Sequence, residues 1–142
     1  MDERHARVSA SFERQGLMKT LGARLARVAD GEVDIGMPFG GALSQQHGYA
    51  HAGSITSIVD SACGYAALTR APAGHGVVTV EFKVNFLRPA IGQRFLAVGR
   101  VVHAGRTMGV CTGEVRAFTG EGGDCKVVAL MQATVAFVKE GA

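Results

Sequence analysis

The chain has 142 residues, of which 47% are hydrophobic and 19% charged, and its 15 Lys and Arg stand against 12 Asp and Glu. This length and composition predict a single globular domain over residues 1–142 and exclude a disordered or collagen-like chain. The basic residues form no run of five or more, so a nucleic-acid-binding protein is not expected. The 20 glycines are spread along the chain and are expected at turns, at close packing contacts or beside a ligand.

The three cysteines show no C-x-x-C spacing, so neither a zinc site nor a disulfide framework is predicted. Cys63 is expected to be a small core residue, because no base that would activate its thiol is evident. The N-terminus is charged from its second residue and no run of 18 apolar residues exists, so neither a secretory signal nor a membrane span is predicted. We therefore expect a soluble cytoplasmic protein.

The N-terminal third predicts a helix and a hairpin. Residues from about 2–15 form a short charged segment of helical character that we expect Gly16 to end. The segments 22–28 and 32–38 both alternate small or apolar with polar residues, and an Asp-Gly pair lies between them. This pair between alternating segments is a strong signal for a β-hairpin.

A long loop and a buried helix follow. Residues 39–53 contain four glycines, two histidines and two glutamines without periodicity, which is typical of a functional loop. Residues 54–70 carry small and apolar residues on nearly every side, which predicts a helix buried on most faces. Ser54 is expected to cap this helix, Asp60 is its only acid, and Gly64 is expected where the sheet approaches closely.

The rest of the chain predicts four strands, over residues 76–87, 94–103, 107–118 and 125–138. We expect them to form a four-stranded meander. In the first strand, branched and aromatic residues alternate with polar ones, which places Thr79 on the polar face. One long helix facing an antiparallel sheet is an α+β fold of two layers.

Two segments carry a resemblance to a known family: HGYAHAGSITSIVDSACGYAAL and VTVEFKVNFLRPA. They resemble the PaaI-like acyl-CoA thioesterases of the hotdog fold, in which an antiparallel sheet wraps around one long central helix. That family has an Asn or Gln, then His-Gly-Gly six residues later, then an acid on the helix and a Ser or Thr on the next strand. Gln45, His51, Asp60 and Thr79 stand at these positions, and Ala52 replaces the first Gly of the motif.

The resemblance implies a thioester hydrolase that releases a free acid and CoA. Asp60 would be the general base for water or the nucleophile. The Ala52 N–H, at the start of the helix, would polarise the thioester oxygen as an oxyanion hole. Gln45 and Thr79 would position the water or the thioester, and His51 would hold the loop.

The same resemblance implies how the substrate is bound. Gly53 would allow close approach, and Arg88 and Arg106, at strand ends, would meet the CoA phosphates. Tyr49 and Tyr65 would shape the acyl pocket together with a partner subunit.

No cofactor or metal is expected, because thioester hydrolysis needs neither and the histidines are not spaced as a ligand set. The family's sheets join edge to edge in a homodimer, and dimers often pair again into tetramers. The loop residues then come from one subunit, and the helix acid and the strand Thr come from the other.

Two other functions remain open. A non-catalytic protein that binds acyl-CoA is favoured by Ala52 and opposed by the complete set of Gln45, His51, Asp60 and Thr79. A hotdog dehydratase or hydratase would need a His and an acid in a different arrangement, which the sequence does not show.

Overall fold

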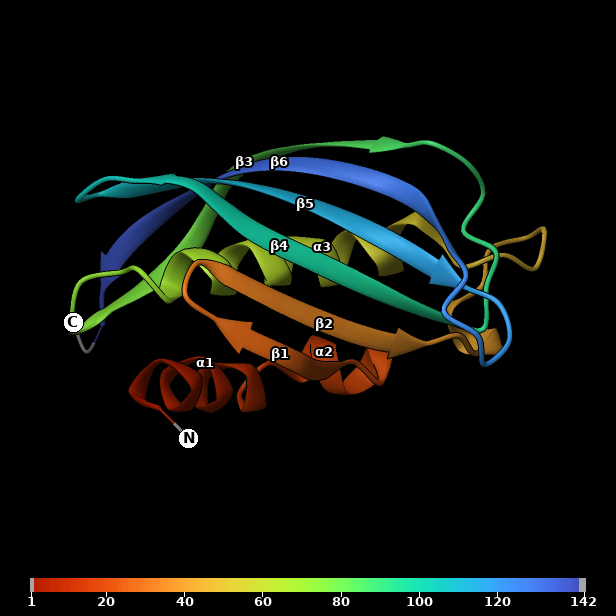
Figure 1. The fold of residues 1–142 in the computed structure, drawn as a ribbon, viewed down its shortest axis with the longest axis horizontal. Helices are drawn as coiled ribbons and strands as arrows, with labels where there is room; N and C mark the ends of the chain where they lie inside the picture. Colours follow the sequence, from red (N-terminus) through yellow and green to blue (C-terminus); the bar gives the residue numbers. More distant parts are fainter. Residues whose placement is uncertain (1, 141–142) are drawn as a thin grey trace.

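In the computed structural model, which describes residues 2–140, one curved antiparallel sheet wraps around a long helix (Figure 1). The helices are α1 (Glu3–Glu13), α2 (Gly16–Leu21), the 3-10 turn η1 (Gly41–Leu43) and α3 (Ala52–Leu68), and the strands are β1 (Arg24–Ala29), β2 (Glu32–Pro38), β3 (His75–Phe86), β4 (Arg94–Ala104), β5 (Met108–Phe118) and β6 (Cys125–Lys139). The six strands lie in the order β1-β2-β4-β5-β6-β3. This is the α+β hotdog fold that the resemblance implied.

The strand order corrects the expected meander. β3 pairs with β6 rather than with β4, and β4 pairs with β2, so the chain crosses from one side of the sheet to the other between β3 and β4. The predicted hairpin forms, and its strand β2 extends the same sheet. Val33, Ile35 and Met37 of β2 are buried in the core around α3. β1 and β3 therefore form the two edges of the sheet.

The predicted N-terminal helix is confirmed as α1, which the Asp2 carboxylate caps by accepting a hydrogen bond from the His5 N–H. Gly16 does not end it; the helix ends at Glu13, and Gly16 begins the unpredicted helix α2. That helix has six residues, too few for a periodic signal. The Arg7 guanidinium ties α1 to the segment after α3 by donating to three carbonyl oxygens, those of Ala71, Pro72 and His75.

The central helix α3 begins two residues earlier than predicted, and its cap is His51 rather than Ser54. The His51 Nδ1 accepts a hydrogen bond from the Gly53 N–H at 2.8 Å. Ser54 lies inside the first turn, and its hydroxyl donates to the His51 carbonyl at 2.7 Å. An imidazole that accepts at Nδ1 satisfies a helix N–H as an Asp or Ser cap would.

The sheet touches α3 at glycines of the strands, not at Gly64 as expected. A Cβ built on Gly99 would overlap the Ala62 carbonyl, and one built on Gly113 would lie 2.6 Å from Val59 Cγ2. A Cβ on Gly64 would lie 3.9 Å from its nearest neighbour, an ordinary contact. Close approach of α3 to the sheet therefore depends on Gly99, which faces the helix backbone, and on Gly113, which faces helix side chains.

A bulge in β3 reverses the predicted face of Thr79. Thr79 pairs with Val135, but Glu81 pairs with the neighbouring Thr134, so Val80 is an extra residue on β3. Directly opposed side chains share a face of the sheet. Because Val135 is fully buried, Thr79 points toward α3, away from the face that carries Glu81.

Candidate active site

The carboxylate of Asp60 and the hydroxyl of Thr79 meet between the middle of α3 and the edge strand β3. Thr79 Oγ1 donates a hydrogen bond to Asp60 Oδ1 at 2.7 Å, and both residues are half-buried. An ionised carboxylate has about four acceptor positions, so one hydroxyl can orient it and still leave room for a water. The pair lines a cavity of about 280 Å³.

Gln45 builds the loop before α3. Its Oε1 accepts hydrogen bonds from the His47 N–H at 2.6 Å and the Tyr49 N–H at 3.1 Å, around a turn in which Gly48 has a φ of 85°. Its side-chain NH₂ makes no hydrogen bond within residues 2–140. Gln45 thus fixes the loop with its oxygen and leaves its amide as a donor.

The N–H groups at the start of α3 differ in availability. The His51 N–H donates to the Leu43 carbonyl at 2.8 Å, and the Gly53 N–H is taken by the His51 ring. The Ala52 N–H has no hydrogen-bond partner in the part of the chain that the structure describes. The lone N–H of the first turn carries a partial positive charge and can bind an anionic oxygen.

The backbone tolerates an alanine at position 52, and Gly53 makes room for the His51 ring. No residue other than glycine has a positive φ among residues 2–140, so the backbone accommodates an alanine at position 52 without strain. A Cβ on Gly53 would lie 3.0 Å from His51 Nδ1. The space at Gly53 therefore admits the capping imidazole.

Within one chain, the residues around Ala52 lie away from Asp60 and Thr79. Gln45, His51 and Ala52 line a cavity of about 420 Å³, separate from the one that holds Asp60 and Thr79. Ala52 and Asp60 are eight residues apart on α3, which is about 12 Å along the helix axis. One chain alone does not bring the Ala52 N–H and the Asp60 carboxylate to a single carbonyl group.

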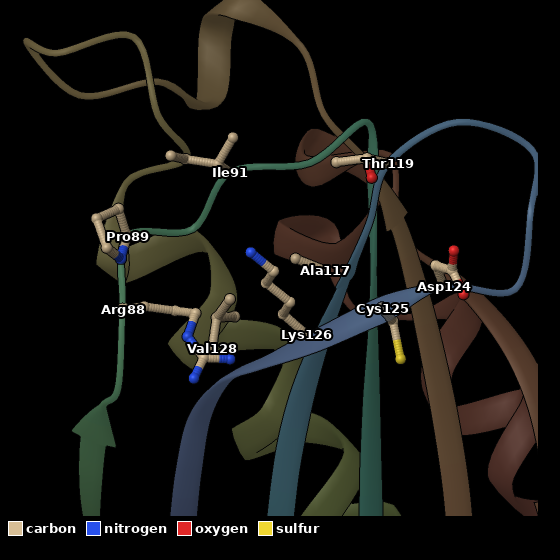
Figure 2. Close-up of a pocket in the computed structure, with 9 residues that line it drawn as sticks. All are labelled: Arg88, Pro89, Ile91, Ala117, Thr119, Asp124, Cys125, Lys126 and Val128. Carbon is tan, nitrogen blue, oxygen red and sulfur yellow. The ribbon is translucent and has the colours of Figure 1, made fainter.

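Arg88 lines two cavities: the one that Ala52 also lines and another of about 480 Å³, which Figure 2 shows. Its guanidinium donates to the Val127 carbonyl at 3.0 Å. Lys126 is a second cation in this cavity (Figure 2), and sequence reasoning missed it. Only the pairing of β3 with β6 indicates that Lys126 lies here. Phe86 pairs with Ala129, so the start of β6 lies beside the residues that follow β3.

Arg106 is at the other end of the sheet. It lies in the turn between β4 and β5. Met108, two residues further on, pairs with Ala136, whereas the end of β3 near Arg88 pairs with Ala129. Seven residues of a strand span about 23 Å. The structure therefore does not bring Arg106 and Arg88 together on one chain.

The buried cysteines are core residues. Burial raises the pKa of the Cys63 thiol far above its usual range and that of Cys111 to about 11, so both thiols stay protonated at neutral pH. Among the described side chains, no group of three or more His, Cys, Asp and Glu is arranged to hold a metal ion. Within residues 2–140, no helix has the length and apolar character needed to cross a bilayer.

The central helix carries a carboxylate held by a hydroxyl group and begins with an N–H that is unpaired within residues 2–140. This combination suits the transfer of an acyl group to water, that is, the hydrolysis of an ester or thioester. The family model of the thioesterase superfamily matches residues 47–123, more than half of the chain. The protein belongs to the thioesterase superfamily and is a hydrolase.

Several known proteins are similar to this chain. A protein of Halobacterium salinarum that is named as an esterase is 30% identical over 114 residues, which cover 77% of this chain and 75% of the relative. The crystal structure of a thioesterase family protein from Silicibacter pomeroyi is 45% identical, covers 96% of this chain and 98% of that chain, and has a TM-score of 0.92. The E. coli PaaI protein, from the phenylacetic acid degradation operon, shares the fold with a TM-score of 0.83 at 24% identity, over 98% of this chain and 94% of that one.

Proposed function

We propose that the protein hydrolyses acyl-CoA thioesters to a free acid and CoA, with Asp60 as the group that activates or attacks. The hydrogen bond from Thr79 to Asp60 is the observation that carries this proposal. It holds a carboxylate in a fixed orientation at a cavity, as a general base or a nucleophile requires. The superfamily supplies the reaction class. Arg88 and Lys126 outnumber the single carboxylate of their cavity, Asp124, and so favour a substrate with phosphate groups.

The reaction can follow either of two courses. As a base, Asp60 removes a proton from water while the hydroxide adds to the thioester carbonyl. As a nucleophile, its carboxylate adds directly and forms an anhydride that water then hydrolyses. In both courses the Ala52 N–H stabilises the oxyanion of the tetrahedral intermediate, the C–S bond breaks, and the CoA thiolate leaves and takes up a proton.

We propose that two copies of the chain complete the site. The cavity of Asp60 is separate from the cavity that Ala52 lines. A thioester carbonyl bound at Asp60 therefore needs the Ala52 N–H of another chain. The edge strand β3 favours such pairing, because within residues 2–140 its backbone is unpaired on one side. Four of its apolar side chains are also exposed: Val78, Val80, Phe82 and Phe86. We propose a homodimer joined along β3, and pairing of two such dimers into a tetramer, as the resemblance implies.

The decisive experiment measures the release of free CoA thiol from short-, medium- and aryl-chain acyl-CoAs. We expect the protein to hydrolyse at least one of these acyl-CoAs. Binding of acyl-CoA without turnover would contradict the enzyme and support a protein that only binds acyl-CoA. Neither binding nor turnover on the whole panel would contradict acyl-CoA as the ligand.

The Lys126→Gln variant tests whether Lys126 contacts the phosphate groups of CoA. We expect KM for acyl-CoA to rise about tenfold with kcat little changed, since a phosphate contact made equally in the ground and transition states contributes to binding alone. KM for the matching N-acetylcysteamine thioester, which lacks the nucleotide, should not change. Lys19→Gln, at an exposed position of α2, is the matched control. A rise in KM for both substrates would contradict a phosphate contact.

A further inference from the structure

The N-terminal helix supplies two polar side chains to the cavity of Asp60. Ser11, at the end of α1, and Gln15, just after it, line this cavity together with Ser61 and Tyr65 of α3. We refer to these four residues as the polar cluster. Sequence reasoning placed neither Ser11 nor Gln15 near the site, because a contact between α1 and α3 spans about 50 residues of sequence.

Hydrogen bonds organise the polar cluster around the Tyr65 hydroxyl. Gln15 Nε2 donates to Tyr65 Oη at 2.7 Å and to Ser61 Oγ at 3.4 Å, and Ser11 Oγ lies 3.1 Å from Tyr65 Oη. Tyr65 is only 4% exposed. Within residues 2–140, Gln15 Oε1 accepts no hydrogen bond and Ser61 donates none. The cluster therefore keeps both an acceptor and a donor for a ligand.

The cavity is small, and glycines keep it open. Its volume is about 280 Å³, at the lower limit of typical ligand sites. Gly64 and Gly76 contribute no side chains to its wall, and an exposed carboxylate, Glu140, also lines it. The cavity thus suits a compact group, and the carboxylate disfavours an anionic one.

We infer that the polar cluster binds a hydroxyl group on the acyl chain, so that the enzyme prefers a short hydroxyacyl-CoA to an alkyl acyl-CoA of the same length. This inference rests on the proposed function. Tyr65 is five residues beyond Asp60 on α3, about 7.5 Å along the axis, which is the reach of a five- or six-carbon chain. An alkyl end in this position would leave the hydrogen-bonding groups of Gln15 and Ser61 without partners, which disfavours it.

The test compares kcat/KM for 6-hydroxyhexanoyl-CoA, hexanoyl-CoA and adipyl-CoA. We expect the hydroxyacyl substrate to be favoured about tenfold over hexanoyl-CoA, as one hydrogen bond to a buried polar site allows, and adipyl-CoA to be the poorest. Gln15→Met and Tyr65→Phe should each bring the ratio of the first two substrates close to one. Gln132→Met, at an exposed position of β6, is the matched control and should keep the wild-type ratio.

Gly64→Ala gives a second, independent measurement. The added methyl group fits the helix but narrows the cavity, so kcat/KM should fall more for the two six-carbon substrates than for acetyl-CoA. Equal kcat/KM for the hydroxylated and alkyl substrates in the wild type would overturn the inference and leave the thioesterase proposal intact. So would a ratio that Gln15→Met and Tyr65→Phe, shown to be folded by their melting temperatures, leave unchanged. Hydrolysis of no acyl-CoA at all would overturn both.

Discussion

Asp60→Asn is expected to lower kcat for acyl-CoA hydrolysis by about 10²–10⁴-fold, the range that a general acid or base contributes. The amide oxygen of Asn can still accept the hydrogen bond that Thr79 donates to Asp60, so the fold and the cavity should be preserved. The amide cannot take up a proton from water or attack a carbonyl. The measurement is single-substrate kinetics together with the melting temperature of the variant.

Ala52→Pro is the matching change in the other half of the site. Ala52 is the first residue of α3, where proline is well tolerated. The preceding His51 already has φ −63° and ψ 137°, the extended conformation that a following proline requires. The substitution therefore removes the N–H and little else, and we expect kcat to fall about 10²–10³-fold, as on loss of one oxyanion-hole donor. Ala52→Gly keeps the N–H and should keep the activity.

Mixing the two variants tests whether two chains share each site. In a dimer of one Asp60→Asn chain and one Ala52→Pro chain, one site carries both changes and the other carries neither. Co-refolding equal amounts should restore roughly a quarter of the wild-type activity, because half of the dimers are mixed and each has one intact site of two. Sites confined to single chains would stay inactive in every mixture, and that result would contradict the shared site.

Gly99→Ala is expected to destabilise the protein by about 3 kcal/mol or more. The added methyl group would overlap the backbone of α3 at Ala62, and backbone atoms cannot move aside as a flexible side chain can. The helix would have to shift away from β4, which costs more than ordinary overpacking. For a chain of this size the loss corresponds to a fall in melting temperature of roughly 10 °C, measured by calorimetry.

Gly64→Ala is the matched control for this prediction. It makes the same chemical change within α3, but its methyl group meets only an ordinary contact with Val77 at 3.9 Å. Alanine is favoured over glycine in a helix by about 1 kcal/mol, so this variant should melt at or above the wild-type temperature. If Gly99→Ala melted as Gly64→Ala does, the close approach of α3 to β4 would be refuted.

The sequence by itself predicted the local elements. The Asp-Gly turn between alternating segments indicated the hairpin, and the apolar residues over 54–70 indicated the central helix, because these signals arise between residues close in the chain. The spacing of Gln45, His51, Asp60 and Thr79 indicated the reaction class through resemblance. Patterns within one segment are enough for such inferences.

Only the tertiary structure decided which of these residues meet. The order of strands depends on pairings between distant segments, so β2 rather than β3 lies beside β4. The bulge at Val80 turns Thr79 toward Asp60, although the regular alternation places it on the opposite face. A bulge follows from the register with β6, which no local pattern encodes.

The remaining features of the site depend on contacts over long sequence distances in the same way. Gln15 reaches the cavity of Asp60 because the C-terminal end of α1 meets α3, where the Phe12 and Tyr65 rings lie at a centroid distance of 6.1 Å. The sequence thus determined which groups could perform the chemistry. Packing between distant segments determined which of them face one cavity, because register and helix docking are set by the whole core rather than by any one segment.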